Sequence, residues 1–287
     1  ATINDLEDVQ VNFDGITYAK GGSVLKQLVA YVGRDAFFSG VSNYFRANAW
    51  KNAELADLLR ELEKTSGREL SSWSAKWLET AGVNTLKPVI ETDANGVITR
   101  FDIRQTAHPD YPTIRPHRLA VGFYDFDGGA LVRTHRIELD VDGESTSVAD
   151  AIGLTRTPLV LVNDDDLAYA KIRLDERSWK TAIEHLAQIE DPLARALIWG
   201  AAWDATRDGE TSPREFIQLV LNNIGTETES TTILTLLRQL VTTGTLYVAE
   251  PHRGVTLELI ADELLALARS AAAGSDLQLQ FTKFYPQ

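Results

Sequence analysis

The chain has 287 residues, of which 44% are hydrophobic and 24% charged, a balance typical of a globular protein of two or three domains. Its formal net charge of −13 disfavours nucleic acid as a partner, because an acidic surface is repelled by phosphates. The absence of cysteine excludes disulfides and thiolate metal sites and is typical of a cytoplasmic protein, and no apolar run reaches the roughly 18 to 20 residues of a membrane helix. We therefore expect a cytoplasmic protein that binds neither nucleic acid nor membrane, and its oligomeric state stays open.

Residues 1–84 are predicted to be helical after a loop over residues 1–17. Apolar side chains recur at helical spacing, and Gly33, Gly67 and Gly82 stand where helices are expected to end. The predicted helices cover residues 23–32, 34–47, 53–65 and a short segment around Trp73, Trp77 and Leu78.

Residues 85–175 change to a period of two, which predicts strands. The segments His117–Phe126 and Ala130–Val141 are joined by Asp127-Gly128-Gly129, a sequence typical of a hairpin turn. Further strands are expected near Val97–Ile103, at Pro158–Val162 and at Ala168–Leu174. Some six or seven short strands with turn signals favour an antiparallel β-sandwich.

Residues 176–287 return to helical spacing. Pro192 and Pro213 suit the first turns of helices, and Ser275 suits the cap of a last one. Helices joined by short turns favour an α-solenoid-like layer, although no strict repeat is present. Phe281 and Phe284 lie so close to Gln287 that we expect this domain to be truncated. The predicted helices are Ser178–Ile189, Pro192–Thr206, Pro213–Asn223, Thr231–Thr243 and Val255–Ala272.

No complete metal or nucleophile motif is found. A zinc peptidase helix needs two histidines one turn apart with a glutamate beside the first, and none of the five histidines has a partner four residues away. There is no Gly-x-Ser-x-Gly elbow and no phosphate-binding loop. The five histidines are His108, His117, His135, His185 and His252.

Several aspartates fall in predicted turns and invite a calcium interpretation. The segment Asp140-Val141-Asp142-Gly143-Glu144 is too short for a calcium loop, which needs alternating carboxylates, a central glycine and a later glutamate. Aspartate also favours turns by bonding its own backbone, so we interpret these residues as turn-forming. The others are Asp125, Asp127 and Asp164–Asp166.

Residues 15–22 read Gly-Ile-Thr-Tyr-Ala-Lys-Gly-Gly and lead directly into the first helical pattern. Taken alone, Tyr18 would be a tyrosine packed near a helix start. Tyr18, Lys20 and Gly21 nevertheless resemble the Tyr-x-Lys-Gly stretch of zinc aminopeptidases of the aminopeptidase N (gluzincin) family, actinobacterial type. Residues 77–82 resemble the end of that family's catalytic domain, and residues 159–171 resemble the close of its β-sandwich. The α–β–α order matches its last three domains.

The resemblance implies a metallopeptidase that removes N-terminal amino acids from peptides. In that family a zinc-bound water attacks the peptide carbonyl and the tyrosine hydroxyl, here that of Tyr18, hydrogen-bonds the oxyanion. A phenol suits this role because it stays protonated at neutral pH and donates. Lys20 and Gly21 are interpreted as structural, the glycine allowing close helix packing. The helical layer is expected to close over the site.

The chain also departs from the family. The zinc histidines, the glutamate base, the third zinc ligand and the amine-binding Gly-x-Met-Glu-Asn segment are absent. We therefore expect the C-terminal part of an aminopeptidase, with zinc in the intact enzyme, none in this chain, and no activity of this chain alone. The expected domains are 1–84, the helical end of the catalytic domain; 85–175, the sandwich; and 176–287, the helical domain. A non-catalytic helical-repeat binding module and a degenerate scaffold relative stay open as alternatives.

Overall fold

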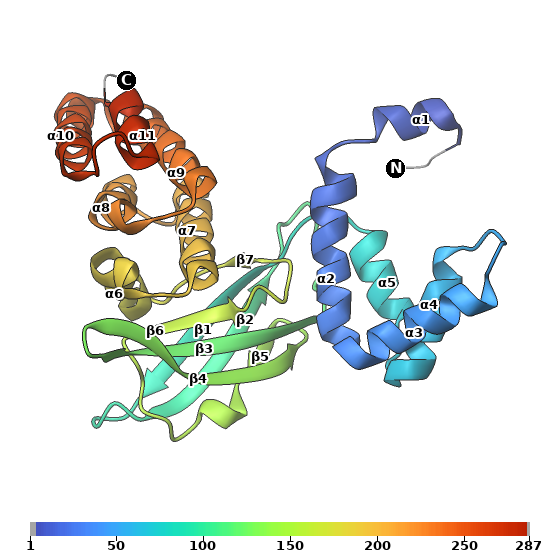
Figure 1. The fold of residues 1–287 in the computed structure, drawn as a ribbon. Coiled ribbons are helices and arrows are strands. Elements are labelled where there is room, and N and C mark those ends of the chain that lie inside the picture. Colours follow the sequence, from blue (N-terminus) through green and yellow to red (C-terminus); the bar gives the residue numbers. More distant parts are fainter. Residues whose placement is uncertain (1–3, 286–287) are drawn as a thin grey trace.

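The structure is a computed structural model that describes residues 4–285. Helices α1 to α5 lie at one end of two small sheets, and helices α6 to α11 stack on them (Figure 1). The first five helices are Leu6–Val11, Gly21–Val32, Arg34–Ala47, Leu55–Ser66 and Ser71–Leu78. The helices predicted at 23–32, 34–47 and 53–65 are confirmed to within two residues.

The predicted loop over residues 1–17 is wrong in part, because Leu6–Val11 form helix α1. The Asp5 side chain caps this helix by accepting from the amide of Asp8, and Glu7 and Asp8 place negative charge in its first turn. None of its residues is buried. A π-helical turn, Ile16–Lys20, then runs directly into α2.

One face of α2 anchors the first helical region. Val24, Leu28 and Val32 recur at helical spacing and are buried. They share an apolar core with side chains of α4 and α5 and of the segment between these helices. The partners are Leu62, Leu70, Trp73 and Trp77.

Seven strands follow among the described residues, in two sheets with the orders β5-β2-β1-β7 and β4-β3-β6. Their bounds are β1 Thr85–Thr92, β2 Ile98–Thr106, β3 His117–Asp127, β4 Ala130–Val141, β5 Ser145–Ser147, β6 Leu159–Asp164 and β7 Lys171–Ile172. The hairpin between β3 and β4 is confirmed, with φ of 55° at Gly128 and 93° at Gly129, as its two-residue turn requires.

The strand predicted at Ala168–Leu174 is mostly wrong, since only Lys171 and Ile172 pair. The Asn163 side chain bonds both the amide and the carbonyl of Ala168, which folds the preceding residues into a loop. Strand β7 also pairs parallel to β1, so the first sheet is not wholly antiparallel.

Strand β6 joins the sheets to the C-terminal helices, and all six of its residues are buried. Val160 and Val162 point into the core between the two sheets. Leu159 and Leu161 alternate with them and pack in the core of the C-terminal helices. Both faces of β6 are therefore covered, which explains its unbroken apolar sequence.

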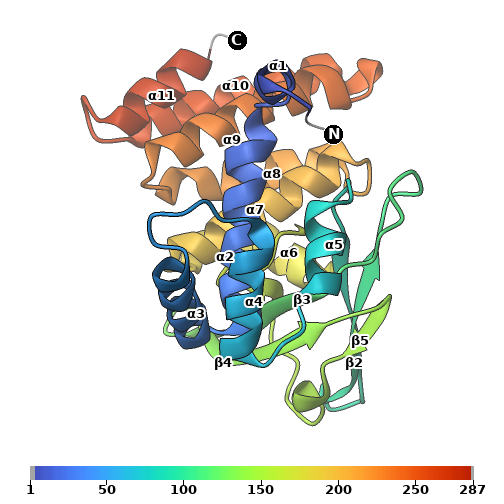
Figure 2. The same cartoon turned by 90° about the vertical axis from the view of Figure 1, so that its right-hand side faces the viewer.

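Helices α6 to α11 form a layer on the sheets, with α10 and α11 farthest from them (Figures 1 and 2). They are Glu176–His185, Pro192–Arg207, Pro213–Asn223, Ser230–Thr242, Glu250–Ser270 and Asp276–Phe284. Pro192 and Pro213 occupy first turns, and Ser275 caps α11, as predicted. The helix predicted to begin at Val255 begins at Glu250, since Pro251 lies in its first turn and does not interrupt it. No helix within residues 4–285 has the length and apolar character needed to span a membrane.

A buried guanidinium ties the first helical region to the sheets. Arg115 is 1% exposed and stacks over the ring of Trp77 at 5.4 Å. It donates hydrogen bonds of 2.6 to 3.4 Å to five oxygen atoms, none of them a carboxylate. The acceptors are the carbonyl oxygens of Lys76, Ala81 and Thr113 and the side-chain oxygens of Thr80 and Asn84.

His117, at the start of β3, is fully buried beside this junction. The Gln105 amide nitrogen donates to the carbonyl of Gly143, so Oε1 of Gln105 faces His117 and accepts from its Nε2–H at 3.0 Å. Nδ1 of His117 then finds no partner among the described residues. Burial, together with the charge of Arg115, lowers the pKa of His117 to about 3.

We predict that His117 contributes to acid sensitivity. The folded pKa of His117 lies below the ordinary value of 6.5, so between these two pH values the unfolded chain binds a proton on this residue and the folded chain does not. The free energy of unfolding therefore falls as the pH drops from 6.5 toward 3. Glutamine does not titrate. From about pH 7 to pH 4.5 the free energy of unfolding should therefore decrease by about 2 to 3 kcal/mol more in the wild type than in His117→Gln. Urea unfolding at both pH values measures this difference, and parallel loss in the two proteins would contradict it.

We predict opposite effects for alanine at two glycines. A Cβ at Gly122 in β3 would overlap the buried carboxylate of Asp164, which Tyr124 and Arg133 hold in place, so Gly122→Ala should cost about 2 to 4 kcal/mol. A Cβ at Gly200 in α7 meets nothing within 4 Å, so Gly200→Ala should stabilise by about 0.5 to 1 kcal/mol. Urea unfolding of both variants checks the two signs.

Candidate active site

Tyr18 lies in the π-helical turn Ile16–Lys20, immediately before α2. Its side chain is 77% exposed and rests edge-on against the ring of Phe13, with the centroids 5.7 Å apart. Tyr18 is therefore not the packed core residue that a tyrosine near a helix start would ordinarily be. Its hydroxyl makes no hydrogen bond to another of residues 4–285.

The two motif residues beside it behave differently. Lys20 is partly buried, and this burial, with a smaller contribution from the nearby charge of Arg115, lowers the pKa of its ammonium group. The close packing expected of Gly21 is not found within residues 4–285, because a Cβ there would contact only the carbonyl of Ile16 at 3.9 Å.

The surface around Tyr18 is unusually apolar. Large side chains on both sides of the turn are between 41% and 82% exposed. Such a concentration on one segment is typical of a surface that another part of a protein covers. These residues are Leu6, Val9, Val11, Phe13, Ile16 and Leu25.

The residues present do not fit a zinc ion. Nowhere in residues 4–285 do three His, Cys, Asp or Glu side chains gather as metal ligands would. His117, the most enclosed of the histidines, is held by Gln105 beside Trp77, and His185 packs edge-on against Phe126.

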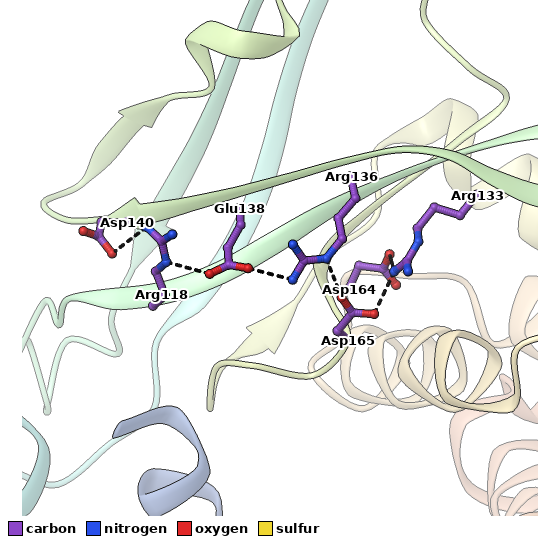
Figure 3. A network of polar contacts seen from close by, with 7 residues as sticks. All are labelled: Arg118, Arg133, Arg136, Glu138, Asp140, Asp164 and Asp165. Carbon is purple, nitrogen blue, oxygen red and sulfur yellow. Dashed lines mark hydrogen bonds and ion pairs between the residues drawn. The ribbon is translucent and has the colours of Figure 1, made fainter. Parts of the chain in front are cut away.

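Four of the aspartates of the predicted turns pair with cations: Asp140, Asp164, Asp165 and Asp166. Arg118 of β3, Glu138 and Arg136 of β4, and Asp165 after β6 form a row of alternating charge (Figure 3). Arg133 bridges the carboxylates of Asp164 and Asp165, and Asp140 accepts from Arg68 and Arg118. Asp140, Asp164 and Asp165 are thus paired with arginine, whereas Asp125 and Asp142 accept from the backbone amides of Phe126 and Gly143.

Gln27, which lies on the helix that follows the motif, was not identified from the sequence. It is fully buried, and its Oε1 accepts from the amide of Tyr169 at 2.9 Å. The sequence does place a polar residue on the apolar face of α2, between Val24 and Leu28, and this could have marked Gln27 as unusual. Its partner lies 142 residues away, so no local pattern identifies the bond.

Comparison with known proteins gives two family matches. Residues 1–77 match the model of the peptidase family M1 domain, and residues 159–284 match that of the ERAP1-like C-terminal domain. Aminopeptidase N of Streptomyces lividans is 53% identical over 99% of this chain, and the chain covers 34% of that protein. The tricorn protease-interacting factor F2 of Thermoplasma volcanium is 23% identical over 91% of the chain, which covers 30% of it.

A solved structure agrees in fold. Aminopeptidase A of Legionella pneumophila, in complex with aspartic acid, superposes with a TM-score of 0.61 over 96% of this chain and 35% of its own length, at 15% identity. The chain spans about a third of the length of these relatives. The resemblance first indicated by Tyr18, Lys20 and Gly21 is therefore confirmed: the chain is similar to aminopeptidase N over nearly its whole length, and residues 1–77 are similar to the peptidase family M1 domain.

Proposed function

We propose that this chain is the C-terminal part of a zinc-dependent aminopeptidase that removes N-terminal amino acids from peptides, and that Tyr18 is its contribution to the active site. The observation that carries the proposal is the position of Tyr18. It lies in the segment similar to the M1 domain, in the exposed turn before a helix with one buried face, and its hydroxyl makes no hydrogen bond to another of residues 4–285. A hydroxyl held in this way suits the role of donor to a developing oxyanion.

Within this proposal the three regions have separate tasks. Residues 1–84 form the helical end of the catalytic domain, residues 85–175 form a β-sandwich that supports it, and residues 176–287 form an α-solenoid-like layer that limits peptide entry. The core shared by the two sheets and the stacking of α6 to α11 support this division. Zinc ligands and the general base come from outside these residues, and the cysteine-free composition supports a cytoplasmic location.

We predict that Tyr18→Phe in the full-length enzyme lowers kcat about 10²- to 10³-fold and changes KM little. The lost hydroxyl acts on the charge that develops in the transition state, whereas the ring that contacts Phe13 remains. Steady-state kinetics on an aminoacyl anilide measures the effect. Tyr111→Phe is the matched control, because Tyr111 is also exposed but lies in a loop, and it should stay within about twofold of the wild type. Wild-type kcat in Tyr18→Phe would falsify the proposal.

We predict further that the 287-residue chain alone releases no amino acid from a chromogenic aminoacyl anilide, with or without added zinc. The sequence lacks the paired histidines and glutamate of a zinc peptidase helix. The chain should also bind an apolar dye through the exposed side chains around Tyr18. Turnover by the chain alone contradicts inactivity, and a monodisperse chain that binds no dye favours a self-sufficient binding module.

A further inference from the structure

The loop between β6 and β7 is strained. We call residues 163–169, which begin with the last two residues of β6, the aspartate loop. Asn163, Asp165 and Asp166 have φ of 64°, 67° and 55°, in the left-handed region that residues with a Cβ rarely adopt and that Asn and Asp tolerate best. Strain of this kind persists only where surrounding contacts determine the conformation, and it concentrates where structure serves a function.

The sheets hold the aspartate loop from one side. The Asn163 side chain bonds the amide and the carbonyl of Ala168, each at 2.8 Å. Asp164 is buried and accepts from the Tyr124 hydroxyl at 2.9 Å and from Arg133 at 2.8 Å. Figure 3 shows Arg133 and Arg136 converging on Asp165, with nitrogen–oxygen distances of 2.7 and 2.6 Å. The loop backbone is thereby fixed to β3 and β4.

On its other side the aspartate loop holds helix α2. The amide of Tyr169 donates to Oε1 of the fully buried Gln27 at 2.9 Å, and Lys26 donates to Asp166 at 2.7 Å. Among the described residues, these two are the hydrogen bonds that α2 side chains make with the sheet region. The Lys26–Asp166 pair is about half exposed and adds little, so the buried bond of Gln27 is the main one.

Helix α2 extends without interruption from the turn that carries Tyr18. Lys20, at the boundary, has φ of −66° and ψ of −46°, so the backbone stays helical from Ile16 to Val32. The apolar contacts of Val24 and Leu28 bury the helix but are non-directional. The bond at Gln27 has a defined direction and length, so it constrains the rotation of the helix about its own axis more closely than the apolar face alone does.

We infer that Gln27 is a positioning residue for Tyr18, and that the strained aspartate loop presents the Tyr169 amide that holds Gln27 in place. The inference rests on the proposed role of Tyr18 and adds to it the means by which the hydroxyl is aimed. Gln27 touches no reacting atom and acts through the helix alone.

The test is a double-mutant cycle in the full-length enzyme. Gln27→Met keeps the length of the side chain and removes the acceptor, and it breaks no second bond because Nε2 of Gln27 finds no partner among the described residues. We expect kcat to fall about tenfold with KM within about twofold, since small misplacements of a catalytic group cost rate. In a Tyr18→Phe background the same substitution should lower kcat less than about twofold, because there is no hydroxyl left to misplace.

Two controls keep the cycle decisive. Lys26→Met removes the neighbouring exposed pair on the same helix and should change kcat less than about twofold. Asparagine tolerates the left-handed backbone, so Asp165→Asn weakens only the ion pairs that hold the aspartate loop to the sheet. It should lower kcat less than Gln27→Met does, and it should leave kcat unchanged in the Tyr18→Phe background. This variant decides the matter if Gln27→Met fails to fold.

Each outcome has one meaning. Equal losses of kcat with and without the Tyr18 hydroxyl make Gln27 a merely structural residue and overturn the inference. Unchanged kcat in Tyr18→Phe alone overturns the proposed function instead. Faster hydrogen exchange of the amides of residues 16–24 in the Gln27→Met chain, compared with Lys26→Met, supports the same inference without any activity measurement.

Discussion

The arrangement of the molecule depends on the buried guanidinium of Arg115. A cation held away from water without a carboxylate is costly, and it is tolerated here because all its N–H groups reach oxygen atoms. Those oxygens belong to the end of α5 and to the segments that enter β1 and β3, so separating these parts would leave the charge unsatisfied. The helical region that carries Tyr18 and the sheets are therefore fixed to one another.

Other buried contacts also hold neighbouring regions of the molecule together. Strand β6 has one face in the core between the sheets and the other in the core of α6 to α11. Separating the helical layer from the sheets would therefore expose Leu159 and Leu161 to water. Within that layer, Glu227 accepts from Arg195 and from Trp199 in a buried pair. Polar bonds inside apolar cores are directional, and they fix the register that apolar packing alone leaves free.

The sequence predicted what local physics determines. Helix α3 was predicted at its observed bounds from apolar spacing after Gly33, and the β3–β4 hairpin from its two glycines. Helix α1 was missed because its six residues are too few for a clear periodic signal, and the parallel pairing of β7 depends on residues far along the chain. Tyr18 was identified by its motif. Arg115 and Gln27 could not be identified in this way, because their hydrogen-bond partners lie far away in the sequence. The catalytic role of Tyr18 itself stays a prediction.

An oxyanion donor has to satisfy two opposed demands. Its hydroxyl must be open to substrate, which excludes burial in its own core, yet its direction must be fixed well enough to favour the transition state. In the role proposed for Tyr18 these demands are separated along one helix: Tyr18 is exposed just before its beginning, and Gln27 is fully buried more than two turns later. Because a helix is stiff over this length, order established at the buried end reaches the open end. The left-handed backbone of the aspartate loop costs conformational free energy. In return, the loop places the amide of Tyr169 where a regular strand would not, within hydrogen-bonding distance of Gln27.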